Sequence, residues 1–317
     1  MAMGSGGLGN LSEWSCFTWL LQSGHSKLSS ACCGSAGSAS AHWSGHGEVQ
    51  PICESNHFTA RSVGRVCYDL GVTNSFGTLC SDFYVNQKIS LSMDMPKVRE
   101  VASDIFDRIR KEVPEFQRIR PFENELALES SEIDGRYQWV GLRSRSIGTG
   151  YVNPVTIEDA YRLHRLLLEL SPYYLSITPL DVEYIELVFG FDLHAQENRN
   201  NIVMQSLLAD TPLASLADDG IEQLLDVQPR IGFALNETCD LQAFIEVKTR
   251  TSASETATQM FEDEPISVFL TVRRNGPLQT LEEFVSTFGQ LAGHIEHIAE
   301  HRVIPDVIIP LQQAIGI

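Results

Sequence analysis

The chain has 317 residues, 43% of them hydrophobic and 20% charged, and a formal net charge of −18 at pH 7. This apolar content is enough for a sizeable core, and the negative charge repels phosphate backbones and anionic lipid headgroups. We therefore expect neither nucleic acid nor a membrane as a partner. No apolar run approaches the length of a transmembrane helix and no signal peptide is recognisable, so we expect a cytoplasmic protein.

The first 92 residues differ in composition from the rest of the chain. They hold six of the seven cysteines, are rich in Ser, Gly, His and Trp, and show little periodicity. An odd number of irregularly spaced cysteines argues against a secreted disulfide framework. Two explanations stay open: a disordered leader, or a translation start assigned upstream of the true one at Met93 or Met95. In both cases we expect residues 95–317 to form a single globular region and residues 1–92 to carry no function.

Two helices are expected in the first half of the globular region. Apolar residues recur at helical spacing between Pro96 and Pro114. A second helix is predicted to run to about Leu170, because Thr156 can cap its first amide groups and Asp159 lies in its first turn.

A β-hairpin is predicted between these helices. Residues 123–133 and 136–146 have strand-forming composition and flank Asp134-Gly135, a pair typical of two-residue hairpin turns. A two-residue loop would place Leu128 opposite Gly141.

Residues 181–194 alternate between apolar and mixed positions and predict a strand that is buried on one side. A further hairpin is expected from residues 230–235 and 241–250, and another buried strand from residues 266–273.

The clearest amphipathic helix follows this last strand. Thr280 and Glu283 have the spacing of a capping box, and an apolar stripe then runs from Leu281 to Ile298. Pro305 and Pro310 predict that any element after this helix is short.

Together these elements predict an α+β fold, in which a mostly antiparallel sheet of hairpins is covered by two or three amphipathic helices. The two halves, read as β-β-α-β and β-β-β-α, are loosely alike, so the sequence also allows an internal duplication.

The mixed side of residues 181–194 is a candidate binding surface. If helices cover only one side of the sheet, the other side is free to bind a protein or a small molecule, although a solvated sheet surface gives the same pattern. The candidate binding residues are Tyr184, Glu186, Asp192 and His194.

Three histidines in the last helix form a candidate metal site. Residues three, four and seven positions apart share one side of a helix, and His297 and His301 have the spacing at which two imidazoles bind one zinc ion. His294 could contribute a third nitrogen. The alternative is that these histidines face solvent and interact with the helix dipole.

No nucleophile elbow, phosphate-binding loop, zinc-protease helix or kinase signature occurs in the chain. The sequence therefore favours a non-enzymatic binding or interaction protein that uses an open sheet surface and needs no cofactor. The alternative is a metal-dependent hydrolase, with zinc bound by the helix histidines.

Overall fold

The computed structural model describes residues 75–95, 98–122, 124–216 and 223–316. The chain divides into two compact units, Met1–Arg65 and Val66–Ile317, and every described residue belongs to the second unit. Most of the predicted leader, residues 1–74, therefore lies outside the described residues.

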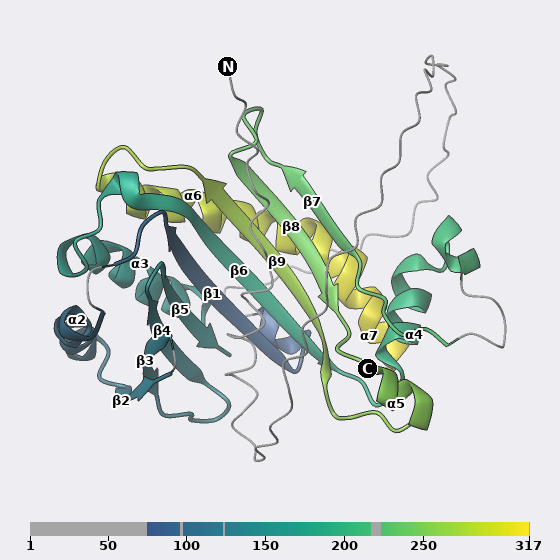
Figure 1. The fold of residues 1–317 in the computed structure, drawn as a ribbon. Helices are drawn as coiled ribbons and strands as arrows, with labels where there is room; N and C mark the ends of the chain where they lie inside the picture. The colour runs from purple at the N-terminus through teal and green to yellow at the C-terminus, as the bar shows by residue number, and fades with distance from the viewer. Residues whose placement is uncertain (1–74, 96–97, 123, 217–222, 317) are drawn as a thin grey trace, which may run out of the picture. The chain divides into compact units, whose positions relative to one another are not determined.

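The described strands form one open antiparallel sheet, in the order β2-β3-β4-β5-β1-β6-β9-β8-β7 (Figure 1). This confirms the predicted α+β fold with an antiparallel sheet. The strands are β1 (Asp82–Leu91), β2 (Phe116–Pro121), β3 (Glu125–Ser130), β4 (Tyr137–Arg143), β5 (Ser146–Val152), β6 (Val182–His194), β7 (Arg230–Ala234), β8 (Leu241–Lys248) and β9 (Pro265–Asn275).

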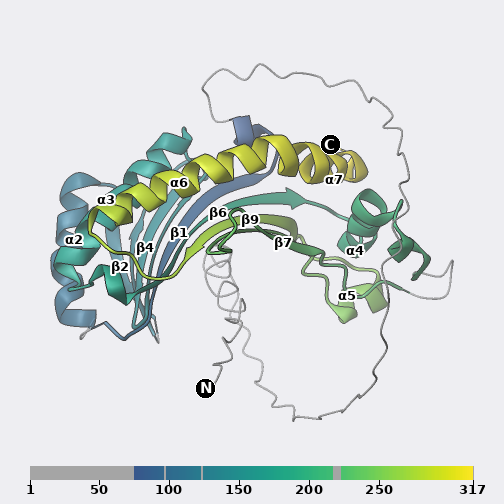
Figure 2. The ribbon, with the colours of Figure 1, turned by 90° about the horizontal axis from the view of Figure 1, so that it is seen from above.

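The long helices pack on one side of this sheet, as Figure 2 shows for α2, α3 and α6. This helix layer consists of α2 (Val98–Glu112), α3 (Ile157–Tyr174) and α6 (Glu282–Ile298), and α6 continues into the π-helical segment η6 (Ala299–Ile308) and α7 (Ile309–Ile315). Among the described residues, no helix covers the centre of the other side, which we call the helix-free face. The remaining helical segments are short: η2 (Ser75–Thr78), η3 (Pro179–Asp181), α4 (Arg199–Val203), η4 (Met204–Leu208), η5 (Pro212–Leu216) and α5 (Ala253–Thr258).

The core lies between the sheet and these helices. The predicted apolar stripe of α6 supplies Phe284 and Phe288, each only 1% exposed, whereas Leu281 is 41% exposed and does not belong to it. On the sheet, the rings of Phe83 and Phe189 meet edge to face with their centroids 5.3 Å apart. Burial of large aromatic side chains of this kind is the main force that holds a helix layer on a sheet.

The predicted boundary of the leader at residue 92 lies too far along the chain, because β1 already belongs to the folded sheet. This strand lies in the middle of the sheet, paired with β5 on one side and β6 on the other. Phe76, just before it, is 3% exposed and packs on Phe83. The prediction failed for residues 75–92 because the short alternating segment follows a long stretch without periodicity.

When β2 and the short helix α5 are left out, the order β-α-β-β-β-α occurs twice along the chain. The first copy is β1, α2, β3, β4, β5 and α3, and the second is β6, α4, β7, β8, β9 and α6. The sheet order is symmetric about the β1–β6 pair, except that β2 adds an outer strand beside β3. The topology therefore repeats, although with different halves from those read in the sequence, where β1, β2 and β5 were missed.

The predicted hairpin forms around Asp134-Gly135, with a different register. Both turn residues have positive φ, 52° and 71°, as expected for a tight hairpin turn. An isolated bridge joins Ile133 and Arg136, but the ladder beyond it is shifted by one residue, so that Leu128 lies opposite Val140 and not Gly141. One extra residue between turn and ladder accounts for the shift.

The predicted helix caps had different outcomes. Thr156 and Asp159 form a complete capping box at the start of α3. Thr280 and Glu283 do not form one, because the Glu283 carboxylate accepts a hydrogen bond from the Gln279 backbone N–H at 2.9 Å and α6 begins without a side-chain cap.

The prediction of a short C-terminal element is wrong. Helical structure continues from α6 through η6 and α7 to Ile315, although Pro305 lies inside η6 and Pro310 in the first turn of α7. The wider π-helical turns around Pro305 accommodate a residue that cannot donate a backbone hydrogen bond, and Pro310 is tolerated where α7 begins. In the described part of the chain, no helix is both long and apolar enough to cross a membrane.

Candidate binding site on the helix-free sheet face

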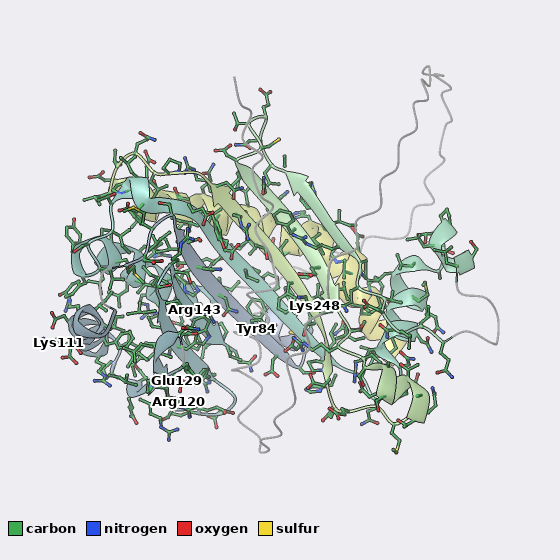
Figure 3. The ribbon with its side chains drawn as sticks, viewed as in Figure 1. Tyr84, Lys111, Arg120, Glu129, Arg143 and Lys248 are labelled. Atoms are coloured by element: carbon green, nitrogen blue, oxygen red, sulfur yellow. The ribbon has the colours of Figure 1, made fainter. Side chains whose placement is uncertain are left out.

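The candidate site is built by strand alternation, which sends every second side chain to the helix-free face. On β1 these are Tyr84, Asn86 and Lys88, and on β6 they are the predicted residues Tyr184, Glu186 and Asp192. Figure 3 shows Arg143, Tyr84 and Lys248 spread across the sheet, on β4, β1 and β8 respectively.

Three aromatic rings on this face lie across glycines of neighbouring strands. Tyr84 pairs with Gly190, Trp139 with Gly150, and Phe244 with Gly232. A Cβ atom added at Gly190 would lie 2.1 Å from the Tyr84 ring, and one at Gly150 would lie 2.1 Å from Trp139 Nε1. Only glycine leaves room for a ring so close to the backbone, and such pairs fix strand register.

Glu186 and Tyr184 belong to one interaction group. Arg273 on β9 donates a hydrogen bond from Nε to Glu186 Oε2 at 2.7 Å, and its guanidinium lies 4.1 Å from the centroid of the Tyr184 ring. Lys88 lies opposite Glu186 on β1, with its Nζ 5.6 Å from the same ring. Because Glu186 is buried, removal of the cations would leave an uncompensated charge.

Asp192 belongs to a second group at the end of the same strand. Ser267 and Tyr84 donate hydroxyl hydrogen bonds to its carboxylate, and Asp82 lies directly opposite on β1. Burial is the largest effect on this carboxyl and raises its pKa from 3.8 to about 6, against the lowering effects of Ser267 and Arg250. Burial and the neighbouring Asp192 also raise the pKa of the Tyr84 hydroxyl well above 10, so it remains protonated.

The predicted fourth residue, His194, lies apart from these groups. Its side chain is 47% exposed at the end of β6, and Nδ1 lies 3.2 Å from the Asp263 carboxylate. The structure therefore brings Tyr184 and Glu186 together through Arg273, places Asp192 in a separate group, and leaves His194 at the exposed end of the strand.

Asn86, at the centre of the face, carries an unused hydrogen-bond acceptor. The residue is 4% exposed, and its Oδ1 has no hydrogen-bond partner among the described residues. A Cβ atom added at Gly150 would lie 2.3 Å from this oxygen, so the Asn86 amide and the Trp139 ring lie side by side above that glycine. Buried polar atoms are nearly always hydrogen-bonded, so an acceptor without a partner among the described residues is unusual at this position.

The basic side chains towards the β2 edge are paired with carboxylates. Arg143 donates to Glu125 at 2.9 Å, and Arg120 Nε lies 3.0 Å from Glu129 Oε2. The first pair joins β4 to β3, and the second joins β2 to β3. On the β8 side, Lys248 Nζ lies 3.6 Å from Glu246 Oε1.

The sequence reasoning missed Tyr84, Asn86, Lys88 and Trp139. The first three were assigned to the leader, although they alternate with the apolar residues Phe83, Val85 and Ile89. That alternation, interrupted by the polar Gln87, was the available signal. Trp139 lay inside the predicted hairpin, but nothing in the sequence indicated that it would lie over Gly150.

The three helix histidines do not form a compact metal site. His297 and His301 are exposed, their rings stack with centroids 4.3 Å apart, and His301 Nδ1 lies 2.9 Å from the His297 carbonyl oxygen. His294 is half-buried. In the described ranges, no group of three or more His, Cys, Asp or Glu side chains is arranged to hold a metal ion.

Comparison with known proteins gives no family assignment for this arrangement. No protein-family model matches the chain, and no curated protein matches it significantly.

Proposed function

We propose that this chain is a non-enzymatic binding protein, and that its helix-free face recognises an extended segment of another polypeptide. The observation that carries the proposal is the Asn86 Oδ1 atom, buried in the middle of the face and without a donor among the described residues. The atom is covered in the structure, so a bound segment would have to displace the atoms above it before one of its backbone N–H groups could supply that donor, as main-chain groups do in many peptide complexes.

The aromatic residues of the face support a polypeptide ligand. Trp139 lies beside Asn86 over Gly150, and Tyr84, on the same strand as Asn86, lies over Gly190. These rings are held against the backbone and are only 5% (Trp139) and 2% (Tyr84) exposed, so they form a rigid apolar floor beneath the face and lose little conformational freedom on binding. Aromatic residues are enriched in protein interfaces for this reason.

The charges of the face argue against a polyanionic ligand. The whole chain has a net charge of −18, yet this face carries basic and acidic side chains in nearly equal numbers, and its cations lie beside carboxylates or aromatic rings. A nucleic acid would have to compete with carboxylates for these cations. The basic residues are Lys88, Arg118, Arg120, Arg143, Arg230, Lys248 and Arg273, and the acidic residues are Asp82, Glu125, Glu129, Glu186, Asp192 and Glu246.

A peptide-display selection against the full chain tests the proposal. Affinities of the selected peptides would be measured by calorimetry for the parent, for Asn86→Leu and for a control, Tyr173→Ser, at an exposed site on α3. Asn86→Leu removes the acceptor but keeps the branching of the side chain at its γ carbon. We expect it to weaken peptide binding about tenfold or more, which corresponds to the loss of a buried hydrogen bond, and we expect the control to bind like the parent.

The stability of the same variant shows whether weaker binding results from the loss of a contact or from a loss of folding. An unsatisfied buried acceptor destabilises the free protein by about 1–3 kcal/mol, so Asn86→Leu should raise the free energy of unfolding while it lowers affinity. The proposal is wrong if no displayed peptide binds, or if the selected peptides bind Asn86→Leu as tightly as they bind the parent.

A further inference from the structure

The two edges of the sheet differ in their protection against added strands. At one edge, β2 carries the exposed residues Arg118 and Arg120, ends at Pro121 and has a register irregularity near Phe116. Charges, proline and irregular register are the usual means of keeping an edge strand unpaired. At the other edge, β7 has none of these features in its middle, and Ile231 there is 63% exposed.

Comparison of the two copies of the topological repeat shows that no described strand occupies the position on the outer side of β7. In the first copy, the outer edge of β3 pairs with β2. The corresponding strand of the second copy is β7, and no described strand pairs with its outer edge. Within the described ranges, the second copy thus has no counterpart of β2.

The backbone of β7 has regularly spaced hydrogen-bonding groups on this edge. The Val247 N–H donates to the Pro229 carbonyl at 3.0 Å, and the Leu235 N–H donates to the Leu241 carbonyl at 2.8 Å. Residues 229 and 235 thus face β8, and the regular register between them makes 231 and 233 face β8 as well. The N–H and C=O groups of Arg230, Gly232 and Ala234 therefore point away from the sheet.

We propose that the β7 edges of two copies of this chain pair with each other and join two sheets into one continuous antiparallel sheet. Pairing about a two-fold axis at Gly232 places Gly232 opposite Gly232 of the second copy and Arg230 opposite Ala234 of the second copy. These are the residues whose backbone groups point outward, so each N–H meets a carbonyl.

The side chains agree with this register. Gly232 is centred between Ile231 and Phe233, so Ile231 of one copy lies opposite Phe233 of the other, on the side of the sheet that carries the helices. Both side chains are apolar, and pairs of this kind stabilise antiparallel strands. Arg230 is the charged residue of β7, and it lies opposite Ala234 and not opposite a like charge, so the edge is complementary to itself.

The dimer should be weak. A single pair of five-residue strands buries less than the roughly 1,000 Å² that stable interfaces reach, and each copy carries a net charge of −18. We therefore expect dissociation at micromolar or higher concentration, and tighter association as added salt screens the repulsion between the copies.

Sedimentation velocity over a concentration series of the full chain tests the pairing. Two variants act on the edge: Ile231→Asp places like charges near the axis, and Ala234→Pro removes an outward N–H without removing a hydrogen bond to β8. Ile119→Asp is the matched control, because Ile119 is also an exposed apolar residue on an edge strand, at 42%, but on β2. We expect both β7 variants to raise the dissociation constant about tenfold or more, with the control unchanged.

Amide hydrogen exchange at low and high protein concentration tests the register. The amides of Gly232 and Ala234 should become slower to exchange as concentration rises, whereas those of Ile231 and Phe233 should be protected throughout by β8. The proposal fails if the chain is monomeric at all concentrations, or if dimerisation is unaffected by the β7 variants. It also fails if protection of Gly232 does not depend on concentration, because a segment of the same chain would then cover the edge.

Discussion

The ring of Tyr84 lies against the backbone of Gly190 on the adjacent strand, so close that a Cβ atom at Gly190 would be 2.1 Å from the ring. This pair joins β1 to β6, the two strands at the centre of the sheet. The same ring carries the hydroxyl group that donates to the buried Asp192. The contact therefore connects the packing of the two halves with the electrostatics of the helix-free face.

Gly190→Ala should destabilise the protein by about 1–3 kcal/mol, because the added methyl group must displace a buried ring or the backbone. Gly289→Ala in α6 is the control, since nothing lies within 4 Å of the position its Cβ would take. That change should stabilise the helix by roughly 0.5–1 kcal/mol. Urea unfolding of both variants measures the difference, and equal midpoints would show that the ring moves aside freely.

A chain that begins at Met95 should fail to fold, whereas one that begins at Val66 should unfold cooperatively. The shorter chain lacks β1, which leaves the facing edges of β5 and β6 without their partner and removes Phe83 from the core. Calorimetry and near-ultraviolet circular dichroism distinguish the two products. A Met95 chain with the melting transition of the parent would show that β1 is dispensable.

Asp192→Asn should stabilise the protein at pH 7 and have little effect at pH 4. The carboxyl has a pKa of about 6 in the folded state and 3.8 as its ordinary value, so between these values the folded chain binds more protons than the unfolded chain. Stability is therefore lost as the pH rises through this window, by on the order of 3 kcal/mol at pH 7. Urea unfolding at both pH values measures the gain, and an equal effect at both would exclude an ionisation origin.

His164 should make the protein less stable in acid. It is fully buried in α3, its Nδ1 lies 2.6 Å from Thr149 Oγ1, and burial lowers its pKa from 6.5 to about 3. As the pH falls from 6.5 to 3, the unfolded chain takes up a proton that the folded chain does not. This difference destabilises the fold by an amount on the order of 4 kcal/mol at the lower limit.

The His164→Leu variant should therefore show a weaker loss of stability between pH 6.5 and pH 3 than the parent. A control change at an exposed residue without an ionisable group, Leu180→Ala, should leave the parental pH dependence intact. Unfolding free energies measured across this range decide the matter, and parallel curves for the parent and His164→Leu would exclude the buried imidazole as the cause.

Zinc should bind the helix histidines only weakly, in the millimolar range, because exposed imidazoles without supporting partners are poorly oriented. Calorimetric titration above pH 6.5 would compare the parent with a His297→Ala/His301→Ala double variant. Sub-micromolar binding that is abolished in the double variant would instead favour the metal-dependent hydrolase, with His294 as the third ligand.

Local sequence patterns determined several elements of this protein. The alternation in β6 and β9, the Asp134-Gly135 turn, the Thr156 cap and the apolar stripe of α6 each depend on neighbours in the chain, and each was predicted. The same alternation assigned Tyr184, Glu186 and Asp192 to one side of a strand. These features follow from the two-residue and 3.6-residue periods of strands and helices, which a sequence displays directly.

Tertiary structure alone decided which strands are neighbours and what the binding face contains. Tyr84 and Gly190 are 106 positions apart, and only the pairing of β1 with β6 reveals why a glycine is needed there. The grouping of Glu186 with Arg273, the raised pKa of Asp192 and the unsatisfied oxygen of Asn86 also arise from residues on different strands. Such long-range pairing depends on the combined packing of the whole sheet, so no local pattern specifies it.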